Sequence, residues 1–401
     1  MTNVSRVGRK HAPALGLALW LTLALLPAAG RADLATKAPE QPALVALPPQ
    51  SPDVPWPTQA WPRAEIGPGV DPLALESAVE TLFSWVGRGD VPDTRALLVI
   101  RQGQVVFERY AEGFGPESRF HTWSMAKSFT NALAGILVER GELALDDAAR
   151  VPEWQEPDDP RSAVTLRHLL NMTSGVDNAD SSGGEPDTGG FVASLLFGVG
   201  ATDVNAFAAD RPLIHPPGTR WAYSTGSSML VAGIIGRAVA EDAEGRRAFI
   251  RSALLDPIGA RNTIFEFDRA GQFLGGSHIY ASARDFARFG LLYLRDGLWE
   301  DQRLLPEGWV DFSRTRAPAD NNGNHGAHFW LNLPPQEHQF VLLPGGPTSV
   351  FEANGNAGQY VIIVPTHDMV IVRLGEMHST SWNELNTALA KLLEVFPASG
   401  G

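Results

Sequence analysis

Cysteine does not occur among the 401 residues of this chain. The chain therefore has no disulfide framework, no thiolate nucleophile, no cysteine-based zinc site and no cysteine for lipid attachment. Positive charge is also scarce, because 32 Lys and Arg residues face 45 Asp and Glu residues and leave a net charge of −13. Such an acidic chain argues against nucleic acid or an anionic membrane as its natural partner.

The apolar run near the N-terminus, at 14–26, is too short for a comfortable membrane span. It follows a basic start that contains Arg6 and Lys10, and small residues follow it up to Ala32. This order is typical of a secretory signal peptide. We therefore expect residues 1–32 to be removed after Ala32, with no membrane span in the mature chain and export to a bacterial periplasm. A retained membrane anchor is the alternative.

The segment that follows, 33–72, is rich in proline, with ten prolines between Ala38 and Pro72. Such a composition favours extended polyproline conformation over a packed element. We interpret it as a linker or as an arm that wraps around the surface. The remaining 73–401 has the texture of a globular domain, and the 44% hydrophobic content of the whole chain is sufficient for a large core.

Periodicity and turn residues place the main elements of this domain. Apolar residues at helical spacing predict a helix over 73–86, and a long helix over 123–140 ends at Gly141. Capping boxes at Ser282 and Ser381 open two later helices. Their ranges and the two predicted hairpins are as follows: helices 283–295 and 382–395, hairpin strands 96–101 with 105–110, and 359–365 with 369–374.

Strands thus lie near both ends of the domain, with helices between and after them. The simplest packing joins the two hairpins in one antiparallel sheet that is flanked by the terminal helices. The central residues, about 142–340, then form an inserted and mostly helical lobe. The predicted fold class is α+β.

The chain has 4 lysines and 28 arginines, and beyond residue 72 only Lys127 and Lys391 remain as lysines. An ammonium group in a desolvated site can lose its proton and act as a base, whereas a guanidinium in practice cannot. Lys127 lies three residues after Ser124 at the start of the long helix, so both side chains share one face. The helix N-terminus adds backbone N–H groups where an oxyanion would form. This arrangement predicts an activated serine nucleophile.

The stretch from Ser124 to Lys127 resembles the S-x-x-K motif of the serine β-lactamase and penicillin-binding-protein superfamily. The resemblance extends over about residues 90–395 and is strongest to the esterase-like and 6-aminohexanoate-dimer-hydrolase-like branch. It implies a β-lactamase-like fold. Further matching segments occur in the order of that family: 169–175, 217–225, 282–294 and 355–359.

The resemblance implies that Tyr223 transfers the proton from Ser124 to the leaving group. A phenol close to an ammonium group is expected to have a lowered pKa, which would suit it as a base. A buried tyrosine with a locally bonded hydroxyl is the alternative. The family geometry also implies that the backbone N–H groups of Ser124 and Gln359 form the oxyanion hole.

Two positions depart from the family pattern. Thr225 occupies the usual asparagine position of the second motif, and Asn356-Ala357-Gly358 lacks the Lys or His of the third motif. The missing cation weakens the case for a β-lactamase. Thr225, Asn356 and Gly358 are nevertheless candidate substrate-binding residues, as are Trp123 and Trp330, which adjoin the motifs and are suited to form walls of an apolar pocket.

Two other sets of residues suggest metal sites only weakly. His325 and His328 lie in a Gly-rich segment without an evident third ligand, so a loop is favoured. The acidic residues between 177 and 187 include Asp180 but lack the EF-hand spacing, so a solvated loop beside the active site is favoured. We predict no metal and no cofactor.

The sequence therefore predicts an exported serine hydrolase that acts on small esters or linear amides through an acyl-enzyme on Ser124. A β-lactamase or a D-amino-acid peptidase of the same fold is the first alternative. A non-catalytic protein that binds cell-wall peptides is the second. The partner is a small-molecule substrate, and the oligomeric state stays open.

Overall fold

The fold is described from a computed structural model, which describes residues 41–84, 93–182, 185–186, 190–319, 323–333, 341–377 and 381–399. The predicted signal peptide, 1–32, lies outside the described residues. The helices are α1 Pro72–Phe83, α2 Ala126–Glu139, α3 Leu166–Leu170, α4 Phe191–Phe197, α5 Val204–Ala209, α6 Thr225–Val239, α7 Ala243–Ile250, α8 Ala283–Leu294, α9 Trp309–Ser313 and α10 Trp382–Glu394. Short helical turns are η1 Trp123–Met125, η2 Pro152–Trp154, η3 Pro160–Ala163, η4 Val199–Thr202, η5 Arg251–Leu255, η6 Asn356–Gly358 and η7 Pro365–His367.

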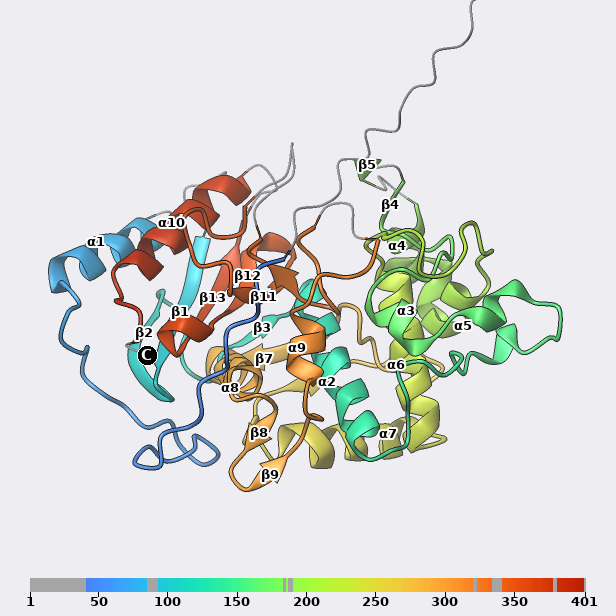
Figure 1. Ribbon diagram of the computed structural model, residues 1–401, viewed down its shortest axis with the longest axis horizontal. Helices are drawn as coiled ribbons and strands as arrows, with labels where there is room; N and C mark the ends of the chain where they lie inside the picture. The colour runs from blue at the N-terminus through green and yellow to red at the C-terminus, as the bar shows by residue number, and fades with distance from the viewer. Residues whose placement is uncertain are drawn as a thin grey trace, which may run out of the picture. The chain divides into compact units, whose positions relative to one another are not determined.

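The strands are β1 Asp93–Arg101, β2 Gln104–Tyr110, β3 Arg119–His121, β4 Ser181–Ser182, β5 Glu185–Pro186, β6 Ile264–Phe265, β7 Ile279–Ser282, β8 Leu298–Trp299, β9 Gln302–Arg303, β10 Trp330–Leu331, β11 Phe351–Gly355, β12 Gln359–Val364 and β13 Met369–Glu376. Six of them form the main sheet, in the order β10-β11-β12-β13-β1-β2, with antiparallel neighbours throughout. Strand β13 pairs with β1, and this pairing joins the C-terminal hairpin to the N-terminal one (Figure 1). The predicted α+β class and the joining of the two hairpins in one sheet are confirmed.

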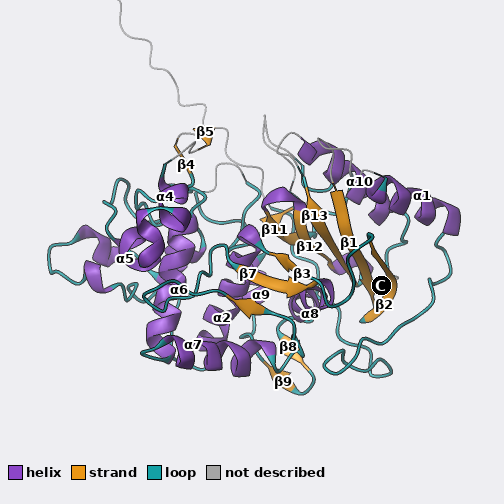
Figure 2. Ribbon diagram, turned by 180° about the vertical axis from the view of Figure 1, so that it is seen from behind, coloured by secondary structure: helices purple, strands orange, loops and turns teal. Residues whose placement is uncertain are grey.

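The central strands of this sheet are buried on both faces, which explains their nearly continuous apolar sequence. Along β12, Val361 and Ile363 belong to the core cluster with α2, α6 and α8. The alternate residues Tyr360 and Ile362 belong to the cluster with α1 and α10. Helices α1 and α10 therefore cover one face of the sheet, whereas α8 covers the other (Figure 2).

Helix α8 begins as its sequence predicts, because the Ser282 hydroxyl accepts a hydrogen bond from the Asp285 N–H at 3.2 Å. The reciprocal half of the expected capping box is replaced. The Asp285 carboxylate accepts hydrogen bonds from the Asn262 N–H and from Arg288. Helix α8 also packs on β12, β13 and β1, so it lies on the sheet and not in the helical lobe where 142–340 had included it.

The sequence pattern did not reveal the short strands. Strands β10 and β11 extend the sheet by one edge, and β3, β7 and β6 form a separate three-stranded sheet. Strands of two to five residues carry too few residues for a period of two to stand out. The pairing of β3 with β7 matters for function, since β3 leads directly into η1.

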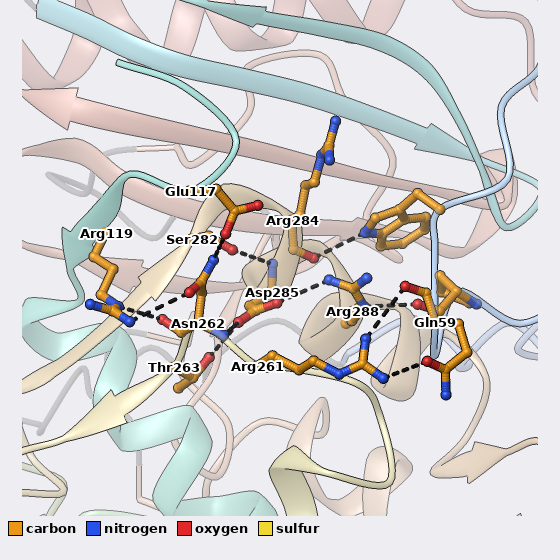
Figure 3. A network of polar contacts seen from close by, with 12 residues as sticks. Gln59, Glu117, Arg119, Arg261, Asn262, Thr263, Ser282, Arg284, Asp285 and Arg288 are labelled. Carbon is orange, nitrogen blue, oxygen red and sulfur yellow. Dashed lines mark hydrogen bonds and ion pairs between the residues drawn. The ribbon is translucent and has the colours of Figure 1, made fainter. Parts of the chain in front are cut away.

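Residues 41–66 run along the body of the protein as a docked arm. Buried arginines donate hydrogen bonds to its carbonyls: Arg314 to Val45, Arg295 to Pro48 and Arg288 to Pro57, at 2.7 to 3.1 Å. A proline-rich backbone has few N–H groups but keeps its carbonyl oxygens. Arginine side chains only donate hydrogen bonds, so they are suited to bind those carbonyls. Figure 3 shows part of this contact, in which Arg261 and Arg288 reach the segment around Gln59 from beside Asp285.

Candidate active site

Ser124 is the middle residue of η1, the turn that precedes α2. The segment before it is held by Thr122, whose hydroxyl donates to the Ser277 carbonyl at 2.8 Å and accepts from the Ile279 N–H at 3.1 Å. Trp123 adopts a left-handed backbone conformation, with φ of 46°. Bulky residues rarely adopt that conformation, and it marks a sharp change of direction immediately before Ser124.

Lys127 lies one turn later on α2, and its side chain is 2% exposed. Its Nζ contacts three oxygens: Ser124 Oγ at 3.0 Å, Thr225 Oγ1 at 3.0 Å and the Gly276 carbonyl at 2.9 Å. Burial lowers the pKa of Lys127 to about 8, although the Asp180 carboxylate opposes that shift. The structure thus brings the two residues together as predicted, with an amine that can become neutral near physiological pH.

Tyr223 lies beside Ser124 and Lys127. Its hydroxyl is close to Ser124 and Trp330, and its ring lies 5.0 Å from Lys127 Nζ. The expectation of a lowered pKa is wrong, however. Burial, together with the negative charge of Asp180, raises the pKa of Tyr223. Tyr223 is therefore a neutral hydroxyl, suited to donate a proton.

Thr225 is 3% exposed, and its hydroxyl is used entirely within the protein. Its Oγ1 is bonded to Lys127 and to Asp180 Oδ2, the latter at 2.7 Å, while its N–H donates to Asp180 Oδ1 at 2.5 Å. The structure thus assigns Thr225 to the surroundings of the lysine and not to a substrate-binding surface. The reason is that burial leaves the hydroxyl no face open to a ligand.

The position of Asp180 differs from the solvated loop that its sequence context predicts. Asp180 is half-buried and lies beside Thr225, and its own N–H donates to the Tyr223 carbonyl at 2.8 Å. An acidic residue in a segment rich in Gly, Ser and Asp has the signature of a surface loop. No local spacing connects position 180 with position 225, so the contact could be found only in the folded chain.

The third motif forms the turn η6 between β11 and β12. Gly355, the last residue of β11, lies against Thr122 so closely that an added Cβ would be 2.1 Å from the Thr122 carbonyl oxygen. This glycine is therefore required for the turn to begin beside η1. Asn356 is exposed on this turn, whereas Gly358 is buried beneath Arg373.

Two side chains behind the turn hold it. Arg373 on β13 is fully buried and donates to the Gly358 carbonyl at 2.7 Å and to Thr94 Oγ1 at 3.1 Å. The Gln359 side chain accepts from the Gly375 N–H at 3.2 Å, and its backbone pairs with Gly355 in the ladder. Gln359 thus lies at the edge of the turn, as the oxyanion-hole prediction requires, and that role stays a prediction.

The two tryptophans that are predicted to form walls of the pocket lie near Tyr223 and Ser124. The Trp330 ring stacks on Tyr223 with a centroid distance of 5.4 Å. The Trp123 ring packs against His121 with a centroid distance of 4.3 Å. Trp123 is therefore the sequence neighbour of Ser124, and Trp330 packs against Tyr223 in the folded chain.

His325 and His328 are buried, not solvated as a loop position suggests. His328 Nδ1 lies 2.8 Å from the Lys127 carbonyl, and its Nε2 lies 3.1 Å from Ser228 Oγ. The His325 ring packs edge-on against Tyr223 and Trp330. Burial lowers the pKa of each histidine to about 3, so both are neutral supports of the site. Within the described residues, no group of His, Asp or Glu side chains is arranged to hold a metal ion.

Comparison with known sequences gives one family and several relatives. The Beta-lactamase family model matches residues 93–393. The chain is similar to the protein Rv1367c of Mycobacterium tuberculosis, with 28% identity over 318 residues that cover 64% of this chain and 77% of that protein. It is also similar to the 6-aminohexanoate-dimer hydrolase of Paenarthrobacter ureafaciens, with 24% identity over 340 residues that cover 82% and 84% of the two chains.

Solved structures with a similar fold include EstCE1, a hydrolase with promiscuous acyltransferase activity. The TM-score is 0.58 at 16% identity, over 80% of this chain and 98% of EstCE1. A penicillin-binding-protein homologue from Caulobacter crescentus has a TM-score of 0.60 at 17% identity, over 82% of this chain and 98% of that chain. At these identities the similarity concerns the fold.

Proposed function

The chain belongs to the beta-lactamase family, and from that premise we propose that it is an exported serine hydrolase of small esters or linear amides. Its fold is the β-lactamase-like fold, a relative of the chain is a 6-aminohexanoate-dimer hydrolase, and EstCE1, a hydrolase with promiscuous acyltransferase activity, has a similar fold. The proposal assigns the acyl-enzyme to Ser124, the general base to Lys127 and the proton donor to Tyr223.

One observation carries the proposal. Lys127 Nζ lies 3.0 Å from Ser124 Oγ in a site where burial lowers the pKa of the amine to about 8. A solvated lysine beside a helix-start serine would keep its ordinary pKa and would seldom be neutral. A buried lysine that can be neutral and touches a serine hydroxyl is the arrangement that nucleophilic catalysis needs.

In the first step, Ser124 Oγ attacks the substrate carbonyl carbon and transfers its proton to Lys127. The C–O bond forms as the carbonyl π electrons move onto oxygen, and backbone N–H groups of Ser124 and of the turn 356–359 stabilise that oxyanion. The bond to the leaving group then breaks, and Tyr223 supplies the proton that the leaving group takes. The proton on Lys127 replaces the one that Tyr223 gave up.

In the second step, water attacks the acyl carbon and Lys127 accepts its proton. The ester bond to Ser124 breaks, and Ser124 Oγ regains that proton from Lys127. The products are the free acid and the alcohol or amine. No atom of a cofactor enters this balance.

The substrate class follows from charge at the third motif. Neither Asn356 nor Ala357 carries a positive side chain, and the nearby guanidinium of Arg373 is fully buried and bonded to backbone carbonyls. A substrate carboxylate therefore has no cation of this turn to bind. Neutral esters and linear amides fit better than β-lactams or D-amino-acid peptides, which carry such a carboxylate.

The test compares the chain that starts at Asp33 with its Ser124→Ala variant. Both are assayed with short-chain aryl esters, linear amide dimers, D-Ala-D-Ala peptides and a β-lactam. We expect turnover of an ester or linear amide, with a loss of about 10³-fold or more in the variant. Faster turnover of the β-lactam or peptide would favour the alternative enzymes of this fold. No turnover and no covalent adduct at Ser124 would favour a non-catalytic binding protein.

A further inference from the structure

A line of hydrogen bonds crosses the site from Ser124 to Asp180. It runs from Ser124 to Lys127, and from there through Thr225 to the Asp180 carboxylate. The residue at the Asp180 end can act in one direction only, because an ionised carboxylate can accept but not donate.

The Asp180 end decides which way Lys127 points. The Thr225 hydroxyl has one proton, which it donates to Asp180 Oδ2, so its oxygen must accept from Lys127. The Gly276 carbonyl is also an acceptor only. A neutral amine has two N–H groups and one lone pair. Because both N–H groups are thereby committed, the lone pair faces the third neighbour, Ser124 Oγ.

At the other end of the line, Ser124 donates to the lysine lone pair. With neutral Lys127, every proton in the line thus points from Ser124 toward Asp180, and the serine proton points at its base.

We propose that Asp180 is a positioning residue that acts on Lys127 through Thr225, holding the Thr225 proton so that the lysine lone pair is presented to Ser124. This inference rests on the proposed function, because it concerns the activation of the same nucleophile. Thr225 takes the place of the asparagine in the family pattern, and Asp180 supplies the orientation that a hydroxyl, which rotates freely, lacks by itself.

An Asp180→Asn substitution tests this orientation in a defined way. The Thr225 N–H cannot reverse its direction, so it keeps the amide oxygen and turns the amide NH₂ toward Thr225 Oγ1. The Thr225 proton must then find another acceptor, and the nearest one is the lysine lone pair. The substitution therefore makes Thr225 compete with Ser124 for the base.

The substitution also removes the negative charge of Asp180. That loss favours the neutral form of Lys127, whereas the competition from Thr225 hinders its action as a base. The groups that face Lys127 are Asp180, Tyr223, His325 and His328, and Asp180 is the one that raises its pKa. Without the carboxylate, the pKa of Lys127 falls below about 8. The acid limb of any Lys127-dependent rate therefore moves to lower pH while the plateau rate decreases. A merely structural weakening would lower the plateau and leave the limb in place.

The experiment follows the reaction of Ser124 with an alkyl fluorophosphonate by intact-mass spectrometry between pH 5.5 and about 10. In this reaction the Ser124 Oγ–P bond forms, the P–F bond breaks, fluoride leaves and Lys127 takes the serine proton. We expect Asp180→Asn to lower the plateau rate constant about tenfold or more, within the range of acid–base effects, and to shift the limb to lower pH. Thr225→Val should lower the plateau similarly, and Thr225→Ser should restore it.

Asp177→Asn is the matched control, since Asp177 is on the same segment but forms an ion pair with Arg211. It should react like the parent chain. If Asp180→Asn fails to fold, as judged by its melting transition, the labelling rates of Thr225→Val and Thr225→Ser test the proposal instead.

The two proposals fail in different ways. A parent chain that is not labelled at Ser124 would overturn the proposed function itself. A labelled parent chain, with Asp180→Asn or Thr225→Val variants that keep its rate and its limb, would overturn the role of Asp180 alone. A lower plateau with an unmoved limb in Asp180→Asn would overturn it as well.

Discussion

At the scale of single residues, the chain uses lysine where arginine could not serve. Lys127 is buried among oxygens, and burial lowers its pKa to about 8. Burial also raises the pKa of Tyr223. In both residues burial disfavours the charged form, which is the protonated amine of lysine but the deprotonated phenolate of tyrosine. In the proposed mechanism, these opposite shifts suit the lysine to act as the base and the tyrosine to act as the acid.

The lowered pKa predicts the pH dependence of the reaction. The neutral fraction of Lys127 grows as the pH rises through about 8, so hydrolysis should increase tenfold per pH unit well below that value and level off above it. A pH profile of kcat/KM checks this. A profile that is flat between pH 6 and about 9 would contradict Lys127 as the base.

The companion variant at this scale is Lys127→Arg, which keeps the charge but cannot become neutral. Activity should fall about 10³-fold, within the range of general-base effects. Lys391→Arg is the matched control, because Lys391 is the other lysine of the domain and is exposed on α10. That control should keep the parent activity.

At the scale of elements, the site depends on one helix start and one hairpin turn that meet. Gly355 allows the end of β11 to touch the segment before Ser124, and Arg373 ties the turn to β13 from behind. The sheet therefore controls the position of backbone N–H groups that the proposed oxyanion hole uses. The local sequence predicted that Ser124 and Lys127 meet at the helix start, because residues three apart on a helix share a face.

The turn yields a prediction for Arg373→Lys. A lysine cannot reproduce the hydrogen bonds of the guanidinium to the Gly358 carbonyl and to Thr94, so the turn loses its support. We expect kcat to fall about tenfold or more, since misplaced oxyanion donors cost about 10²-fold when removed outright. Arg101→Lys on the neighbouring strand β1 should leave kcat unchanged. Parent-like kcat in Arg373→Lys would show that the turn does not need this clamp.

At the scale of the whole molecule, distant parts of the chain are joined across the sheet. Strand β1 pairs with β13, and the arm at 41–66 is bound by arginines of the C-terminal half. Among the described residues, no helix is both long enough and apolar enough to cross a membrane. The domain that bears Ser124 is thus built from both ends of the sequence, with the helical lobe between them.

The proposal of export belongs to this scale, and the N-terminus tests it. Expression of the full chain in a Gram-negative bacterium should yield a periplasmic protein that begins at Asp33, because 1–32 has the order of a signal peptide. N-terminal peptide mass spectrometry of the cell fractions measures this. A chain that keeps residues 1–32 and sediments with the membranes would support the retained anchor instead.

The sequence by itself determined the features that depend on near neighbours. The Ser124 and Lys127 pair follows from the helical period of 3.6 residues, the start of α8 from its capping residue Ser282, and the hairpin strands from short continuous apolar runs. Only the tertiary structure decided what depends on distant segments. Asp180 meets Thr225 and Arg373 meets Gly358 because separate elements pack together, and no local period encodes such contacts. The same packing removes water from Tyr223, which is why its pKa rises where the charge pattern alone suggested a fall.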